Sequence, residues 1–551
     1  MKKKMRSILT VAIAGMMAAS VMGLVACNNS SDESGKVVMA FVAGTNLLPD
    51  ESKVEAAVDA YCEETYGIGV TFKHVNIYDQ ASIYTNWLGA NEEIDILNLC
   101  FVDPMQYINE KRILCLDDMI TEENAPYLSE TLESRPDMKL LDTKGNLYGI
   151  GTQEIAPAYG GSMIIFKRST LQTLGLYGEG EGQYQEWDQI GYDDLDVIFE
   201  AIQSNPATNK TESGATVYPC PIIASTVPYS TFAPADYMSS GTQSPLAVLK
   251  VEKDGSTKPE VVNYYEMDTF KQYIEKVSEW NAKGYIHPDA LTTSSSFGDM
   301  LDSGQWVSMF LGLQPGLIPQ YNMDYSEEGD SWIALALTEV PYYTSSTPLM
   351  SMAINSKSKR PNKAMRIIDA IFSDEKLVNM LQYGLEGEHW EYASTEEEPN
   401  IGRENGYIIL TQNNLDNSLY TGLPGVYGNK NIIYTAISNG ENIVELIEEA
   451  VAYEELTLEY SNEALAHSSV AAGFIYDPSK QKVRIQNIEG NVISRYLSQL
   501  TTGKGKAGTD GTYTGPGSTY ADFIAALKNA KVDNVIADKQ EQLDAWLALQ
   551  D

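Results

Sequence analysis

The alternation of strand-like and helix-like patterns near the start of the chain constrains its fold more than any other feature. Apolar runs of strand length occupy residues 36–42, 69–75 and 94–99, and segments with helical spacing at 54–61 and 81–88 separate them. This strand–helix–strand–helix–strand order predicts a parallel sheet that helices cover on both faces. Because ligands on such sheets bind at the carboxyl ends of the strands, we expect a site at that edge.

Later patterns predict further α/β structure. Residues 142–150 predict a tight hairpin, in which Gly145 allows the turn. Residues 205–259 and 407–435 are rich in turn-forming and polar residues and predict irregular loops. The remaining predicted elements are strands at 160–166, 306–311, 332–337 and 349–355, and helices at 195–202, 270–280, 362–371, 443–465, 488–500 and 521–549.

The charge balance argues against several classes of partner. The 551 residues carry a net charge of −38 at pH 7, and 43% of them are hydrophobic. This hydrophobic content is typical of a globular protein, and the length suits two or three domains. A strongly acidic surface repels phosphate backbones and anionic lipids. We therefore expect no nucleic-acid binding and no direct membrane contact by the folded protein. We also expect a monomer.

The cysteines do not predict a disulfide framework or a metal centre. Cys62, Cys100, Cys115 and Cys220 leave two disulfides with three connectivities open. Cys62 and Cys100 lie in apolar patterns, which favour buried free thiols. The sequence has no Cys-x-x-Cys motif and only four His, so we expect no zinc site, no other metal and no cofactor.

The amino terminus predicts a secretion signal that ends in a lipidation site. A basic head with Lys2 and Arg6 precedes an apolar run at 8–25, and the sequence Leu-Val-Ala-Cys ends at Cys27. This pattern resembles the lipobox of bacterial lipoproteins, in which the cysteine receives a diacylglycerol and the new amino terminus is acylated, for example with palmitate. We expect a signal peptide at 1–26 and a flexible tether at 27–36. An uncleaved membrane anchor is the alternative.

Short motifs in separated places resemble one protein family. They occur, in the family's order, at residues 90–96, 107–118, 145–150, 355–365, 382–390 and 526–546. In these motifs the chain resembles the extracellular solute-binding proteins of bacterial ABC importers, in the maltose-binding-like family 1. Within that family it resembles a lipoprotein subgroup with a characteristic C-terminal helical region.

The resemblance implies an α/β protein with a two-lobe, periplasmic-binding-protein-like fold and a hinge that the chain crosses several times. The lobes would close on a ligand and present it to the transmembrane subunits of an ABC permease. The protein would then work on the outer face of the bacterial cytoplasmic membrane, anchored at Cys27. The predicted parts are lobe 1 at 37–155, lobe 2 at 156–348, a return to lobe 1 at 349–440, and a C-terminal helical region at 441–551, mostly in lobe 2.

An oligosaccharide is the ligand that the composition favours. Sugars have polar rims and apolar faces, so their sites combine aromatic rings with carboxylates or amides. The chain has 34 Tyr, 12 Phe and 7 Trp, many in predicted loops. Packing is the alternative role for each aromatic residue. The candidate ligand-binding residues come from the ends of predicted strands, from predicted loops and from positions that the resemblance to the family implies: Gly44, Thr45, Asn46, Phe101, Asp103, Tyr159, Tyr229, Phe232, Gln314, His389 and Trp390.

Motifs for catalysis are incomplete. Residues 503–508 match a dinucleotide fingerprint in letters, but no predicted strand precedes them. Residues 356–359 match Ser-x-x-Lys without the partner motifs of penicillin-binding enzymes. We therefore predict a receptor and not an enzyme. The 76 acidic residues leave a surface glycoside hydrolase open as the alternative. A peptide- or phosphonate-type receptor, or a sensor for a membrane kinase, is a third interpretation of the same fold.

Overall fold

The structure is a computed structural model whose folded unit begins at Lys36. The predicted signal peptide, Cys27 and most of the tether lie outside the described residues. The structure describes residues 35–44, 48–100, 102–153, 162–224, 228, 232–238, 246–252, 255–293, 301, 303–312, 330–337, 350–422, 428–437, 443–467 and 469–549.

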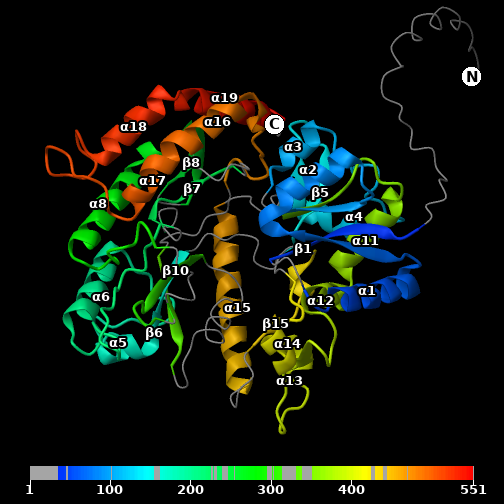
Figure 1. Cartoon of the computed structure of the whole chain (residues 1–551), viewed down its shortest axis with the longest axis horizontal. Helices are drawn as coiled ribbons and strands as arrows, with labels where there is room; N and C mark the ends of the chain where they lie inside the picture. Colours follow the sequence, from blue (N-terminus) through cyan, green and yellow to red (C-terminus); the bar gives the residue numbers. More distant parts are fainter. Residues whose placement is uncertain are drawn as a thin grey trace, which may run out of the picture. The chain divides into compact units, whose positions relative to one another are not determined.

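The first sheet is mixed. Its six strands are, in spatial order, β2 (Val70–Asn76), β1 (Val37–Ala43), β3 (Ile96–Cys100), β12 (Met350–Ile354), β5 (Leu147–Gly151) and β4 (Lys139–Leu141) (Figure 1). β1 pairs in parallel with β2 and β3, as predicted. β12 comes from a distant part of the sequence and runs antiparallel to both β3 and β5. β4 and β5 form the predicted hairpin.

Amphipathic helices pack on this sheet. In α1 (Glu51–Tyr66), Val54, Val58 and Cys62 recur at helical spacing and are buried. Gly67 ends this helix with a left-handed φ of 67°, a conformation that costs glycine little. The other helical elements of this part are η1 (Ile77–Asp79), α2 (Gln80–Ala90), α3 (Pro104–Asn109), α4 (Pro126–Ser134), η2 (Pro136–Met138), α11 (Pro361–Ser373) and α12 (Glu375–Tyr383).

The second part of the fold has two three-stranded sheets. β6 (Ser162–Lys167) lies between β10 (Ser308–Gly312) and β11 (Trp332–Ala336) and is antiparallel to both. The predicted irregular segment 205–259 instead contributes strands, because its apolar residues pair in a sheet that local pattern does not reveal. These are β7 (Ala235–Asp236), β8 (Val248–Val251) and β9 (Thr257–Val262), and the helical elements nearby are α5 (Arg168–Thr173), α6 (Tyr192–Ser204), η3 (Tyr264–Glu266) and α8 (Asp268–Ala282).

A third, smaller part corrects the prediction that residues 407–435 are a loop. The elements here are β13 (Trp390–Tyr392), α13 (Ile401–Asn405), β14 (Tyr407–Leu410), α14 (Gln412–Asn417), η5 (Lys430–Ile432) and β15 (Thr435–Ala436), followed by α15 (Ile443–Ala466). β14 pairs with β13 and with β15, so short strands from separated places form one sheet. The helix predicted at 443–465 is present.

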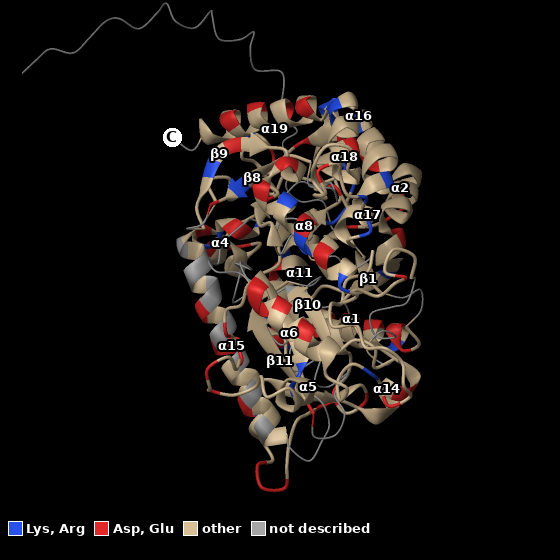
Figure 2. Cartoon of the chain, turned by 90° about the vertical axis from the view of Figure 1, so that its left-hand side faces the viewer, with Lys and Arg blue, Asp and Glu red and all other residues tan. Residues whose placement is uncertain are grey.

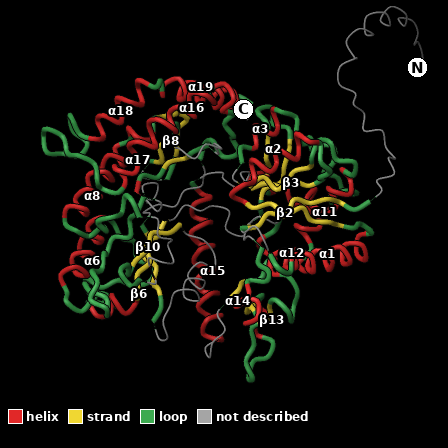
Figure 3. Tube along the Cα trace, viewed as in Figure 1, coloured by secondary structure: helices red, strands yellow, loops and turns green. Residues whose placement is uncertain are grey.

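The C-terminal part is helical, as predicted, and Figure 3 shows helices separated by loops there. The prediction of a single helix at 521–549 is wrong, because Lys531 has a left-handed φ of 64° and separates two helices there. The elements are η6 (Pro478–Lys480), α16 (Lys482–Ile488), a π-helical turn at Glu489–Ile493, α17 (Ser494–Thr501), α18 (Thr519–Asn529) and α19 (Val532–Leu547).

Three apolar cores hold these parts together. The first core contains buried residues from 37–150 and 352–381. The second contains residues from 163–335 together with 471–543, so the C-terminal helices pack with the second part. A small third core lies within 393–450. The predicted lobe bounds stay a prediction, because a shared core does not by itself define a moving body.

Residues 473–477, which we call the bridging segment, contact both large cores. Ile475 is buried in the first core, whereas its neighbours Phe474 and Tyr476 are buried in the second. At the end of the segment, Asp477 Oδ2 accepts a hydrogen bond of 3.0 Å from Asn109 Nδ2 in α3. The chain therefore joins the two cores at residues 473–477, far in sequence from the predicted boundary between the lobes at residue 155.

Candidate functional site

The carboxyl ends of four strands meet at one edge of the first sheet. β1, β2 and β3 are parallel, and β5 shares their direction because β12 is antiparallel to both β3 and β5. Gly44 follows β1 at this edge and is exposed, and Asp103 follows β3. The other candidates predicted here, Thr45, Asn46 and Phe101, lie outside the described residues. The edge is thus where the sequence predicts it, and the ligand contacts stay a prediction.

Asp103 caps the helix that follows β3. Its Oδ1 accepts a hydrogen bond of 3.0 Å from the backbone N–H of Met105, and Pro104 occupies the first helical position. Burial raises the pKa of Asp103, and the hydrogen bonds from the backbone oppose this effect. An ionised carboxylate has about four acceptor positions, so capacity for a ligand hydroxyl remains.

Gln153 marks the place where the chain leaves the first sheet. Its Oε1 accepts a hydrogen bond of 3.0 Å from the Tyr127 hydroxyl. The same hydroxyl oxygen accepts a hydrogen bond of 3.1 Å from Asn429 Nδ2. The backbone N–H of Gln153 donates to Gly428 O at 3.0 Å, and Lys430 N–H donates to Gln153 O at 2.8 Å. Two distant passes of the chain are therefore bonded side by side. Sequence reasoning placed a crossover near here but missed these side chains, because their partners are far apart in sequence.

Phe232 lies in an aromatic cluster of the second core. Its ring stacks on Tyr192 with centroids 4.7 Å apart, and the Tyr273 ring is 5.9 Å away. Burial raises the pKa of Tyr192 strongly. Phe232 is half-buried, and these are packing contacts, so its predicted ligand role stays a prediction. The other candidates of this part lie outside the described residues: Tyr159, Tyr229 and Gln314.

His389 and Trp390 are buried, and their polar atoms contact other residues of the protein. His389 Nδ1 accepts a hydrogen bond of 2.9 Å from Leu385 N–H, and its Nε2 lies 3.2 Å from Asp50 Oδ2. The Trp390 indole N–H donates to Gly384 O at 3.3 Å. A Cβ at Gly384 would lie 2.7 Å from His389 Nδ1, which explains why glycine stands beside this histidine. All these contacts are structural, and the predicted ligand role of both residues stays a prediction.

Sequence reasoning did not single out Tyr78 and Gln80, which also lie at the carboxyl edge. Tyr78, in η1 directly after β2, is 85% exposed. Gln80 is buried, and its Oε1 has no hydrogen-bond partner. The sequence contains a signal for this position. In Asn76-Ile-Tyr-Asp79, a residue that can cap a helix follows the predicted strand at 69–75, and the aromatic Tyr78 comes two positions later.

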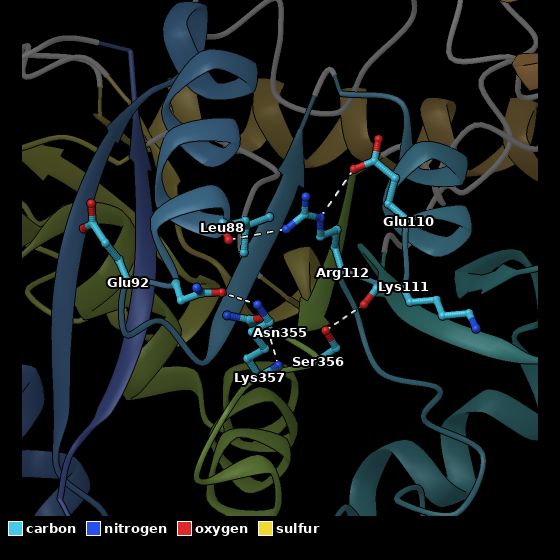
Figure 4. Close-up of a pocket in the computed structure, with 9 residues that line it drawn as sticks. Leu88, Glu92, Glu110, Lys111, Arg112, Asn355, Ser356 and Lys357 are labelled. Carbon is cyan, nitrogen blue, oxygen red and sulfur yellow. Dashed lines mark hydrogen bonds and ion pairs between the residues drawn. The ribbon is translucent and has the colours of Figure 1, made fainter. Parts of the chain in front are cut away.

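A polar pocket of about 200 Å³ lies at the opposite, amino edge of the first sheet (Figure 4). Arg112 donates to Leu88 O at 3.3 Å and lies 3.4 Å from Glu110 Oε2. The Ser356 hydroxyl donates to Lys111 O at 2.7 Å. These groups therefore pair with one another across the pocket.

The cysteines predicted to be free thiols are free. Cys62 and Cys100 are buried, and burial raises the pKa of each thiol to about 12. Cys115 and Cys220 are also unpaired. Thiols with such raised pKa values are poor nucleophiles at neutral pH.

Within the described ranges, no helix is both long enough and apolar enough to span a bilayer.

The fold is that of two-lobe solute-binding proteins. The N-glycan transport solute-binding protein NgtS of Streptococcus pneumoniae superposes with a TM-score of 0.70 at 19% sequence identity, covering 94% of this chain and 100% of NgtS. Its complex with Man5GlcNAc superposes with a TM-score of 0.61. A solute-binding protein of Bifidobacterium longum infantis, described as "HMO binding", gives a TM-score of 0.58 at 13% identity over 93% of this chain and all of that protein. The predicted α/β, two-lobe fold is confirmed.

Sequence comparison finds a relative that is named as a carbohydrate-binding transport protein. The "Carbohydrate ABC transporter substrate-binding protein" of Streptococcus pneumoniae serotype 4 is 24% identical over 304 residues. The alignment covers 54% of this chain and 53% of the relative, so the chain spans about half the length of the curated relative that it matches. Residues 470–548 match the family described as "Domain of unknown function (DUF3502)". The predicted resemblance to ABC-importer solute-binding proteins is confirmed by these similarities.

Proposed function

We propose that this protein is an extracellular receptor that binds an oligosaccharide and delivers it to an ABC importer. The observation that carries the proposal is a fold shared over nearly the full length with NgtS, together with a relative named as a carbohydrate substrate-binding protein. The carboxyl edge supports it, because Asp103 provides an acceptor there for a hydroxyl-rich ligand and Gly44 is exposed beside it.

The receptor works by a change in conformation and makes no covalent bond. A ligand that contacts both lobes stabilises the closed form relative to the open form by its difference in affinity for the two. The bonded crossing at Gln153 and Asn429 is suited to a hinge, because its hydrogen bonds can persist while backbone angles on either side change. We also propose the lobe bounds at residues 155, 348 and 440, which rest on the resemblance to solute-binding proteins. The partner is then the pair of transmembrane permease subunits.

We also propose that a diacyl group on Cys27 holds the receptor, as a monomer, at the outer face of the cytoplasmic membrane. Two acyl chains give stable anchoring where one would be marginal. The net charge of −38 opposes direct contact with anionic lipid and so supports a lipid tether; Figure 2 shows acidic residues on α6, α8 and α19 together with basic residues on the same face. Cys27→Ser should release the protein into the medium, and a variant that stays membrane-bound would contradict the tether.

A binding screen tests the receptor proposal. A soluble form that starts at residue 28 would be heated with Man5GlcNAc, kestose, maltooligosaccharides and oligopeptides. A ligand at about a hundred times its dissociation constant should add roughly 2.7 kcal/mol to stability and raise the melting temperature. Chromatography of the same mixtures checks that the sugar is unchanged.

Each outcome of the screen has a meaning. A stabilising sugar that is recovered intact supports the receptor. Cleavage of the sugar would replace the proposal with the glycoside hydrolase alternative. Stabilisation by oligopeptides alone would keep the fold and the transport role but change the ligand class.

A further inference from the structure

The side chain of Tyr78 is unusually open to solvent for an aromatic residue in this protein. It is 85% exposed, more than any other large hydrophobic side chain in the described part of the chain. Most aromatic side chains here pack in clusters, as Phe41 does on Phe72 with ring centroids 4.8 Å apart. A single exposed apolar side chain is ordinary on a protein surface, so the feature that distinguishes Tyr78 is its place in the fold.

Tyr78 lies at the edge that carries the candidate site. In the parallel pair of β1 and β2 the last partners are Ala43 and Asn76. Gly44 and Tyr78 follow these partners, so both lie just beyond the carboxyl ends of neighbouring strands. Strands in a sheet are about 4.8 Å apart, so an extended ligand at β1 comes within reach of β2. Gly44 has no side chain to obstruct this path.

The backbone that carries Tyr78 is held in place. Asn76 Oδ1 accepts a hydrogen bond of 3.0 Å from Tyr78 N–H. The next helix, α2, is tied to β3 through Gln80 Nε2 and the Tyr84 hydroxyl, which both donate to Asn98 O, the latter at 2.9 Å. A ring on such a fixed turn loses little backbone freedom when a ligand binds.

We propose that Tyr78 forms an aromatic subsite that stacks on the apolar face of a pyranose ring in the bound oligosaccharide. The C–H-rich face of the sugar covers the exposed ring, and the hydroxyl rim of the sugar stays in water or reaches the Asp103 carboxylate after β3. The subsite rests on the proposed receptor function. It adds to that function a residue, beside the end of β2, that contacts the apolar face of the sugar.

The test compares three variants of the soluble form by isothermal titration with Man5GlcNAc and kestose. Tyr78→Ala should weaken binding of the sugar by about tenfold, because the stacking surface is lost. Tyr78→Phe should bind within about twofold of the wild type, because the ring remains. Val197→Ala is the matched control, since Val197 is 54% exposed on α6 in the second part of the fold, and it should leave binding unchanged.

Protection against chemical modification gives a second readout. Nitration of Tyr78 by tetranitromethane, followed by mass spectrometry of its peptide, should fall when Man5GlcNAc is bound. The melting temperature of ligand-free Tyr78→Ala should stay within about 2 °C of the wild type, because the side chain is exposed. This excludes loss of folding as the cause of weaker binding.

The outcomes separate the subsite from the receptor proposal. If the wild type binds a sugar and Tyr78→Ala binds it within twofold, the subsite is wrong while the receptor stands. Equal loss in Tyr78→Phe and Tyr78→Ala would also overturn stacking. If the wild type binds neither these two sugars nor any other glycan of the screen, the proposed function fails and the subsite with it.

Discussion

Lys539 shows how much a single buried charge can matter in this protein. Its Nζ donates to the carbonyl oxygens of Tyr237 and Ala247 at 2.7 and 2.9 Å inside the second core. Burial lowers the pKa of Lys539 to about 7, and the nearby Asp236 opposes the shift. Asp236 is itself buried, which raises the pKa of its carboxyl group. Near neutral pH this lysine is therefore close to losing its proton in the folded state.

Lys539 predicts a pH-dependent stability. Between a folded pKa of about 7 and an unfolded pKa of about 10.4, the unfolded chain binds more protons, so stability rises with pH by at most about 1.4 kcal/mol per unit. Below pH 7 both states are protonated and the cost of burying the charge is fully present. Denaturant unfolding of wild type and Lys539→Met from pH 6 to 9 checks this. The difference between them should grow in favour of the wild type above pH 7, and parallel curves would contradict it.

At the scale of elements, one buried ion pair joins three segments of the first part. Asp95, just before β3, is 1% exposed. Its carboxylate accepts hydrogen bonds from Val38 N–H in β1 at 2.9 Å, from the Ser358 hydroxyl at 2.6 Å, and from Arg360 Nη1 at 2.8 Å. Arg360 stands directly before α11, so the pair fixes the start of that helix against the amino edge of the sheet.

Removing the arginine should leave a buried carboxylate without its cation. We expect Arg360→Met to cost about 3–5 kcal/mol, because the desolvation of Asp95 is no longer compensated. Arg403→Met is the matched control, since Arg403 pairs with Glu386 at 2.9 Å but both side chains are more than half exposed, and it should cost less than about 1 kcal/mol. Denaturant unfolding of both variants measures the difference, and equal costs would show that Asp95 finds other partners.

At the scale of the whole molecule, the bridging segment adds a second connection between the two large cores. It begins three residues after the start of the DUF3502 match at residue 470 and is followed by the helices that pack into the second core. Beside it is a cavity of about 340 Å³, lined by residues 141–143 of the β4–β5 turn and by Trp546, among others. The C-terminal region thus contacts the first part directly and does more than extend the second.

Truncation of Ile475 should loosen this connection. Ile475→Ala removes a side chain that is 5% exposed in the first core and should cost about 2–5 kcal/mol. Hydrogen exchange should rise in α3, whose Asn109 bonds to Asp477, and stay unchanged in β6. Asn109→Ala removes only exposed hydrogen bonds and serves as the mild control, with an expected cost of about 1 kcal/mol. Unchanged exchange in α3 of Ile475→Ala would contradict a bridging role.

Several features of this fold follow from sequence alone. The parallel order of β1, β2 and β3, the β4–β5 hairpin and the helix α15 all have signals that lie within one short window. Hydrophobic periodicity and turn residues are local properties, so a single sequence is sufficient to read them. The place of the candidate site at the carboxyl edge follows from the same order of elements.

Other features were decided only by tertiary structure, because they depend on partners that are distant in sequence. The insertion of β12 between β3 and β5 made the sheet mixed, and the strands within 407–436 formed because each found a partner elsewhere. Whether an aromatic residue is buried is decided in the same way. His389 and Trp390 packed inside, while Tyr78 stayed exposed, because burial depends on which surfaces the folded chain brings together.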